Sequence, residues 1–146
     1  MTALYAGKRF GELAVGDVFT SAMTVNDAHL TLGAGLIADF NPLHVDETFA
    51  RASRYGSRIL HGVITSAILG GPVGMIFAGT ALGYLEHNTR FLAPVRVGDT
   101  LTLHWTVSGK TDKPARKAGI VALRGVATNQ DGVTVAEADG KMLVGY

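Results

Sequence analysis

Apolar and polar side chains alternate along much of the second half of the chain. In residues 101–107, leucine, leucine, tryptophan and valine occupy every second position, with threonine and histidine between them. A period of two is typical of a β-strand with one buried face. The same pattern predicts strands over residues 118–128 and 133–144, joined by a hairpin turn at residues 130–132, and the charged residues 110–117 are expected to form a loop.

The first half of the chain predicts one strand followed by short helices. Residues 18–25 are rich in Phe, Thr and Val, and we expect a strand there. Good N-cap residues predict one helix over about residues 26–38 and a shorter one over residues 47–52. Between them, Pro42 lacks an amide hydrogen and pushes the preceding residue towards an extended backbone. Residues 39–44 are therefore expected to form a turn.

Residues 62–85 contain no charged side chain and predict the central element of the fold. Length alone would permit a membrane-spanning helix. Six glycines and Pro72 interrupt the segment, so we expect a helix over about residues 62–70 that ends or kinks there and resumes as far as residue 77. A helix that is apolar on every side can form the centre of a soluble fold, and no membrane span is expected. Residues 82–92 are mixed in pattern and lead into the strands.

Together, these elements predict an α+β fold with a single domain over residues 1–146. An apolar helix needs a sheet wrapped about it, and an antiparallel sheet follows it directly in the chain. One small sheet of this kind leaves an open edge. A second copy of the chain is the natural cover, so a homodimer or a higher homo-oligomer is expected.

Composition limits the classes of function. The chain has 146 residues, a net charge of +1, 47% hydrophobic residues and 17% charged residues. This balance argues against disorder and gives no electrostatic basis for binding nucleic acid. There are no cysteines, which excludes disulfides and thiolate chemistry. Residues 1–8 lack the basic-then-apolar order of a secretory signal, so a cytoplasmic protein is expected.

The turn at residues 39–44 carries the strongest candidate chemistry. It puts Asp39 and His44 five residues apart around Pro42, and a rigid turn can hold both side chains over one small volume. Ordinary pKa values of about 4 for aspartate and about 6.5 for histidine suit such a pair to proton transfer at neutral pH. The plainer alternative is that Asp39 caps the turn and His44 only packs in the loop.

Two later segments accompany this turn. Residues 37–46 form the sequence Ile-Ala-Asp-Phe-Asn-Pro-Leu-His-Val-Asp, residues 57–62 form Ser-Arg-Ile-Leu-His-Gly, and residues 90–101 form Arg-Phe-Leu-Ala-Pro-Val-Arg-Val-Gly-Asp-Thr-Leu. In order and spacing, the three segments resemble the MaoC-like dehydratases, which include the (R)-specific enoyl-CoA hydratases. The resemblance implies a hot-dog fold that dimerises through its sheets. It also implies a thioester substrate on coenzyme A or an acyl carrier protein, and reversible addition of water to a trans-2-enoyl group to give an (R)-3-hydroxyacyl thioester.

The resemblance also implies roles for particular residues. Asp39 and His44 would grip the attacking water, with Asp39 as general base and His44 orienting the water and sharing proton transfer to the α-carbon. Gly62, where the central helix begins, can offer a free backbone N–H to the enolate-like thioester oxygen, although a plain helix start would look the same. Asn41 is counted among the substrate-binding residues, but its side chain is expected mainly to fix the turn.

Four further residues are assigned to substrate binding. Arg54 and Arg58 precede the central helix and could meet the phosphates of coenzyme A. The lysine-rich residues 110–117 could do the same, but a solvated surface is the favoured interpretation for them. His61 could line the pocket, with a buried structural histidine as the favoured alternative. Ser66 stands near the position where some family members carry a serine, in a register shifted by about one residue, and a small helix-packing residue is the favoured interpretation for it.

No metal is expected, because the polar residues of segment 39–46 lack the spacing of a metal site. No cofactor is expected either, since coenzyme A enters only as part of the substrate. The main alternative function is a hot-dog acyl-CoA thioesterase, which needs one carboxylate and a water but not an Asp/His pair. A third class, a non-catalytic acyl-binding or assembly subunit, is disfavoured because the pair is intact.

Overall fold

The computed structural model describes residues 6–146. The first five residues, which belong to the stretch considered for a secretory signal, lie outside the described residues. Five strands form one antiparallel sheet in the order β1-β3-β4-β5-β2. The strands are β1 (Val18–Thr24), β2 (Ala81–Phe91), β3 (Thr100–Lys113), β4 (Ala118–Thr128) and β5 (Thr134–Gly145). The helices are α1 (Asp27–Ile37), α2 (Pro42–Val45), α3 (Glu47–Ala52) and α4 (Gly62–Ile76), with single 3₁₀ turns at Phe10–Glu12 and Pro114–Arg116.

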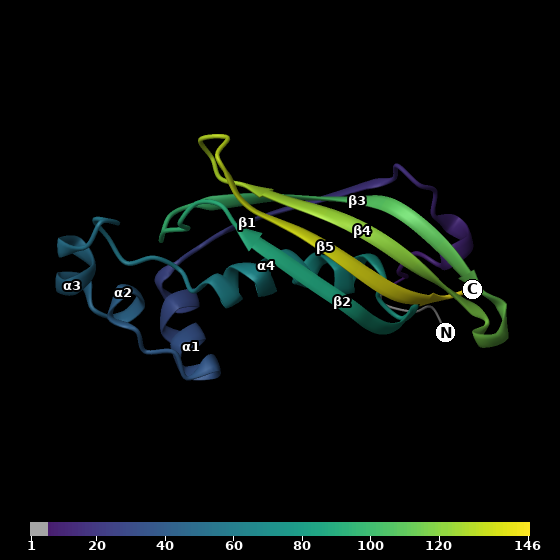
Figure 1. Cartoon of the computed structure of the whole chain (residues 1–146), viewed down its shortest axis with the longest axis horizontal. Helices are drawn as coiled ribbons and strands as arrows, with labels where there is room; N and C mark the ends of the chain where they lie inside the picture. Colours follow the sequence, from purple (N-terminus) through teal and green to yellow (C-terminus); the bar gives the residue numbers. More distant parts are fainter. Residues whose placement is uncertain (1–5) are drawn as a thin grey trace.

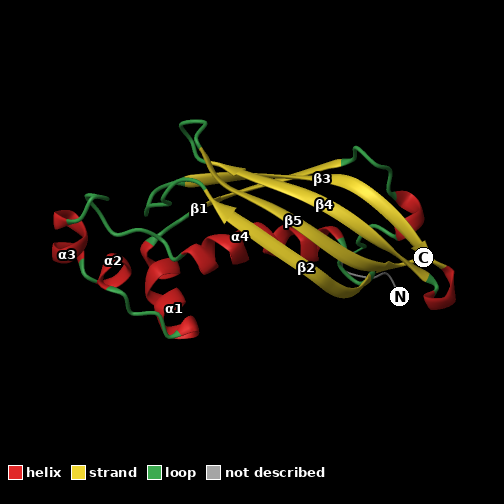
Figure 2. Cartoon of the chain, viewed as in Figure 1, coloured by secondary structure: helices red, strands yellow, loops and turns green. Residues whose placement is uncertain are grey.

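The sheet curls over α4, and this is the hot-dog arrangement that the sequence predicted (Figure 1). The helices α1, α2 and α3 do not cover the sheet. They lie together beyond the end of α4 at which that helix begins, as the red helices on one side of Figure 2 show. The α+β class is therefore confirmed, and the polar turn between α1 and α2 lies next to the start of the central helix.

The core lies between α4 and the concave face of the sheet. Alternate residues of β3 are buried, which confirms the period of two in that segment. On the helix side, Leu69, Val73 and Phe77 are fully buried at intervals of four residues. Leu69 and Val73 share one face of α4, and the C-cap residue Phe77 continues it, so that face packs against the sheet, while glycines and small residues occupy much of the rest of the helix.

The central helix does not end near Pro72, since α4 runs continuously from Gly62 to Ile76 with Pro72 inside it. A proline removes one backbone hydrogen bond and disturbs the carbonyl groups one turn before it. Here the indole Nε1 of Trp105 donates a hydrogen bond to the carbonyl oxygen of Leu69 at 2.9 Å. The carbonyl that loses its donor to Pro72 is that of Ile68, so the bond from Trp105 fastens the neighbouring carbonyl of the same turn to β3, and burial of Leu69 and Val73 favours the continuous helix.

Two further expectations need correction. Residues 110–113 belong to β3 and pair with β4, so the predicted charged loop is reduced to a tight turn at Pro114–Arg116. Polar side chains are tolerated there because the consecutive residues 111–113 are all exposed, so neither side of this end of the strand is buried. The turn after Asp39 contains a single turn of helix, α2, whose first residue is Pro42. No helix within residues 6–146 is long and apolar enough to cross a membrane.

Candidate active site

The segment that carries Asp39 is shaped by its own backbone hydrogen bonds. Helix α1 ends at Ala38, which adopts a left-handed conformation with φ of 56°. The Asp39 Oδ1 accepts a hydrogen bond from the Asn41 N–H at 3.2 Å, and the Asn41 Oδ1 accepts one from the Leu43 N–H at 3.0 Å. Asn41 is thus the N-cap of α2, which agrees with the expectation that it fixes the turn.

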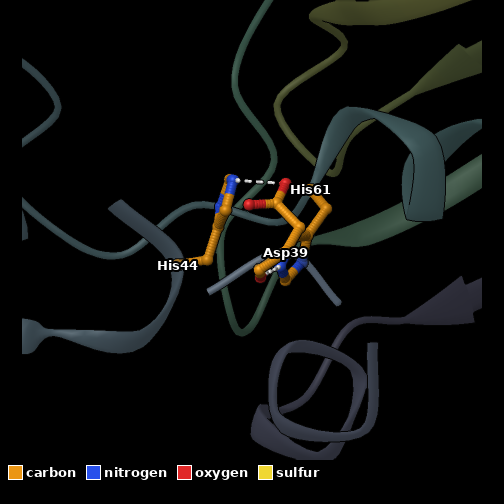
Figure 3. Close-up of side chains that lie close together, drawn as sticks. All are labelled: Asp39, His44 and His61. Carbon is orange, nitrogen blue, oxygen red and sulfur yellow. Dashed lines mark hydrogen bonds and ion pairs between the residues drawn. The ribbon is translucent and has the colours of Figure 1, made fainter. Parts of the chain in front are cut away.

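The turn brings Asp39 and His44 together. The Nε2 of His44 lies 3.8 Å from the Oδ2 of Asp39, and Figure 3 shows the carboxylate turned towards the imidazole. The other ring nitrogen, Nδ1, lies 2.8 Å from the carbonyl oxygen of Ile59. A carbonyl can only accept, so Nδ1 carries the hydrogen and Nε2 of the neutral ring has a free lone pair. Both functional atoms are therefore free to bind a third group.

A separation of 3.8 Å is too long for a direct hydrogen bond. It does allow one water oxygen to lie about 2.8 Å from both atoms at once. The side chain of His44 is 12% exposed and that of Asp39 is 43% exposed. The pair is thus reachable from solvent, and the imidazole is the more enclosed partner.

His44 also lines a cavity of about 320 Å³. Gly62 and Thr65 from α4 and Phe91 from β2 form part of its wall. As the first residue of α4, Gly62 has a backbone N–H that no carbonyl of its own helix can accept. A Cβ at Gly62 would lie 3.3 Å from the Phe91 ring, so a larger residue would crowd this wall. The cavity wall therefore contains the imidazole of His44 and the N-terminus of α4, and no side chain at Gly62 blocks access to the backbone N–H there.

His61 does not line this cavity, because its side chain is fully buried. Its Nε2 lies 2.9 Å from the backbone carbonyl oxygen of Asp39, and its ring stacks on the ring of His44 with centroids 3.9 Å apart. Donor atoms of Asp39, His44 and His61 all lie within 4.8 Å of one another. One nitrogen of each imidazole is already bonded to a backbone carbonyl, and the absence of a metal stays a prediction.

A family comparison fits this geometry. Residues 14–129, which include Asp39, His44 and Gly62, match the model of the MaoC like domain. The chain belongs to the MaoC-like family. The matched range extends from the loop before β1 through the end of β4, so it includes the α1–α3 segment as well as most of the hot-dog core.

Individual MaoC-like relatives agree over most of the chain. The (R)-specific enoyl-CoA hydratase of Rhodospirillum rubrum is 33% identical over 129 residues, which is 82% of this chain and 88% of that protein. The enzyme of the same name from Aeromonas caviae is 33% identical over 103 residues, covering 70% of this chain and 77% of that protein. The unliganded R-hydratase of Pseudomonas aeruginosa matches with a TM-score of 0.84 and 27% identity, covering 94% of this chain and 85% of that chain.

The two arginines near the MaoC-like site have different surroundings. Arg58 donates from Nη2 to Asp27 at 2.6 Å and from Nε to Glu47 at 2.8 Å, so it ties α1 to α3. Hydrogen bonds from Arg58 and then Arg51 hold the pKa of Glu47 below its usual value, and those to Glu47 and Asp27 raise the pKa of Arg58. Arg58 also lines a separate hollow of about 260 Å³ with His44 on the side of α1, whereas Arg54 is exposed and lines the 320 Å³ cavity that includes Gly62. Of the two, Arg54 is the better placed to meet a substrate phosphate.

Ser66 is not among the residues that line this cavity. Its hydroxyl lies 2.7 Å from the Oγ1 of Thr89 and 3.0 Å from the Nε2 of His87, so it belongs to the seam between α4 and β2. Thr65, the neighbouring hydroxyl, does line the cavity, but its Oγ1 donates to the carbonyl of His61 at 3.2 Å. A one-residue step on a helix turns the side chain by about 100°, which accounts for the different surroundings of the two.

Sequence reasoning did not select several residues of the site. Thr65 and Phe91 form part of the cavity wall, and the backbone carbonyl of Ile59 fixes the tautomer of His44. Phe91 belongs to residues 90–101, so the segment was recognised although the ring itself was not. Nothing in the sequence identifies a backbone carbonyl as the partner of His44, because that contact depends on how two loops pack.

Proposed function

We propose that this chain catalyses reversible addition of water to trans-2-enoyl thioesters, giving (R)-3-hydroxyacyl thioesters. The observation that carries the proposal is the pair of free acceptor atoms on Asp39 and His44, 3.8 Å apart, beside a cavity that also holds the N-terminus of α4. The names of the similar enzymes from Rhodospirillum rubrum and Aeromonas caviae support this reaction and its stereochemistry.

In the proposed reaction, Asp39 and His44 share the attacking water. As its oxygen bonds to the β-carbon, one water proton passes to the pair, and the electrons of the double bond move towards the thioester carbonyl. The Gly62 N–H donates to the oxygen on which this charge develops. The pair then returns the proton to the α-carbon, so the net change is addition of one water. The two side chains act as one coupled acid–base unit, so the returned proton is assigned to the pair.

The exposed edge of the same cavity is the proposed binding site for the coenzyme A or carrier-protein part of the substrate. Arg54 lies over the ring of Tyr55, with its guanidinium carbon 5.3 Å from the ring centre, and both residues line the cavity. A guanidinium is well suited to phosphate, which coenzyme A and carrier-protein thioesters both contain. We assign the phosphate contact to Arg54. Arg58 supports it indirectly, by holding together the helices before the cavity.

A second copy of the chain is the proposed partner. The edge strand β2 presents exposed apolar side chains, among them Leu82, Leu85 and Phe91. A long edge strand with exposed apolar side chains favours pairing with another sheet. Dimerisation through the sheets would cover these side chains and enclose the cavity wall that Phe91 forms. Light scattering on the purified chain is expected to give the mass of a homodimer or of a larger homo-oligomer.

The decisive experiment follows crotonyl-CoA in two ways. The absorbance of the conjugated enoyl thioester is recorded while a thiol reagent reports free coenzyme A. Hydration is expected to remove the enoyl absorbance without releasing thiol, and chiral chromatography is expected to show the (R)-3-hydroxy product. Release of thiol would instead make the chain a thioesterase. No change across a panel of enoyl chain lengths would indicate a non-catalytic acyl-binding subunit.

A further inference from the structure

We propose that His61 is a positioning residue that sets the placement of Asp39 and His44 relative to each other. The inference rests on the proposed hydratase function but concerns a side chain that is fully buried and lines no part of the cavity. His61 has direct contacts with both members of the pair and precedes the proposed oxyanion donor in the chain.

The first contact fixes the backbone of the general base. The Nε2 of His61 lies 2.9 Å from the carbonyl oxygen of Asp39, and because a carbonyl can only accept, the imidazole donates. Asp39 follows the left-handed residue Ala38, where α1 ends. The donor from His61 therefore holds the chain at the point where it leaves the helix, and with it the direction in which the Asp39 carboxylate projects.

The second contact fixes the plane of the other imidazole. The rings of His61 and His44 are stacked, with centroids 3.9 Å apart and an angle of 30° between their planes. The edge of His44 is held separately by its hydrogen bond to Ile59. A hydrogen bond at one edge still permits the ring to tilt, whereas a second ring packed against its face does not. The stack thus aims the Nε2 of His44 at Asp39.

Stability alone does not account for a histidine here. The Nδ1 of His61 is buried and has no hydrogen-bond partner among residues 6–146. It faces α1, where a Cβ at Gly33 would lie 3.6 Å from Nδ1 and 3.0 Å from Ile64. A buried nitrogen without a partner costs free energy that an apolar ring of similar size would avoid. The unpaired Nδ1 is compatible with a residue kept for its Nε2 donor and its flat face.

His61 also connects the pair to the third proposed participant. It is the N-cap residue of α4, and its carbonyl accepts from the Thr65 N–H at 2.9 Å in the first turn. The next residue is Gly62. A shift of His61 would therefore move the water-binding pair and the oxyanion donor relative to each other, and a misplacement of about 1 Å can cost about a hundredfold in rate.

The test separates the two contacts with matched variants. His61→Phe keeps an aromatic face but loses the donor, His61→Gln keeps a donor but loses the ring, and His61→Ala loses both. Val73→Ala is the control, because it removes buried volume from the same helix without touching the pair. For crotonyl-CoA hydration, we expect kcat to fall about a hundredfold in His61→Ala and about tenfold in the other two, with KM changed less than about threefold. Val73→Ala should lower Tm but keep kcat.

A result in which folded His61 variants keep kcat would overturn the proposal, as would a loss of kcat in Val73→Ala as large as in His61→Ala. A measurement on the unaltered protein covers the case in which the variants do not fold. Imidazole ¹H–¹⁵N correlation spectra should show His61 as the Nε2–H tautomer, and an Nδ1–H tautomer would overturn the donor role. This spectrum does not depend on turnover, so it stays informative even if enoyl-CoA hydration is not found.

Discussion

Two polar clusters flank the first half of α4, and they differ in how their hydrogen-bonding capacity is used. The first comprises Asp39, His44 and His61 at the start of the helix. The second, which we name the seam cluster, comprises Ser66, Thr89, His87 and Tyr84 between α4 and β2. Both contain a half-buried histidine next to oxygen-bearing side chains, so residue type alone does not distinguish them.

In the seam cluster, each imidazole nitrogen has a partner. The Nε2 of His87 lies 3.0 Å from both Ser66 and Thr89, and its Nδ1 lies 2.6 Å from the hydroxyl of Tyr84. Burial lowers the pKa of His87, although its hydrogen bond with Ser66 acts in the opposite direction. Burial also raises the pKa of Tyr84 to about 12. These shifts favour neutral side chains that hold the helix to the strand.

In the first cluster, by contrast, the Nε2 of His44 and the Oδ2 of Asp39 are too far apart to hydrogen-bond to each other. His44 also faces a cavity of about 320 Å³, whereas none of the seam residues line that cavity. Unused acceptors beside open volume therefore distinguish the candidate site from a cluster of the same residue types whose hydrogen bonds are satisfied. Four predictions test this distinction.

The largest expected effect belongs to Asp39→Asn. The amide keeps the shape of the side chain but cannot take a proton from water, so kcat/KM for crotonyl-CoA should fall by about a thousandfold or more. Asp46→Asn is the matched control, since it removes the same charge from a carboxylate whose Oδ1 only caps α3 through the Phe49 N–H. Unchanged turnover in Asp39→Asn would remove the assigned base.

Ser66→Ala should lower the stability of the protein but leave its activity unchanged. Loss of the hydroxyl removes two contacts of the seam cluster, so the free energy of unfolding should fall by about 1 kcal/mol. Because Ser66 does not line the cavity, kcat/KM should stay within about twofold of the unaltered protein. Urea denaturation and crotonyl-CoA kinetics on the same preparation check both values. A large rise in KM with unchanged stability would support the assignment of Ser66 to substrate binding.

The contrast between the clusters also explains what the sequence could predict. The alternation in residues 101–107 and the apolar run after Gly62 predicted the sheet and the central helix, because burial imposes those periods directly. The Asp39–His44 pair was found because a short turn brings its members together. For Ser66, the sequence left open a substrate contact and a helix-packing role, because the partners of its hydroxyl, His87 and Thr89, lie 21 and 23 residues away. The hydrogen bond from Trp105 to the turn of α4 before Pro72 likewise joins residues far apart in the chain, and no local pattern contains it.

A smaller effect is expected from Arg54→Gln. This side chain is exposed, so an ion pair with a substrate phosphate is screened by solvent, and KM for crotonyl-CoA should rise only about two- to fivefold with little change in kcat. Lys113→Gln is the matched control from the alternative basic segment at the far end of β3. Added salt should reduce the difference between Arg54→Gln and the unaltered protein. If only Lys113→Gln raised KM, the phosphate contact would belong to that segment.

The smallest effect concerns the pH dependence of stability at the seam cluster. The pKa of His87 lies below its ordinary value of 6.5 in the folded chain, so near and below that pH the unfolded chain binds more protons. The free energy of unfolding should therefore decrease as the pH falls through about 6.5 towards the folded pKa, and the contribution should be constant above that window. In His87→Gln this component is absent. Paired urea titrations between about pH 5 and 8 should show the two proteins diverging with pH, and parallel curves would mean that burial does not favour neutral His87.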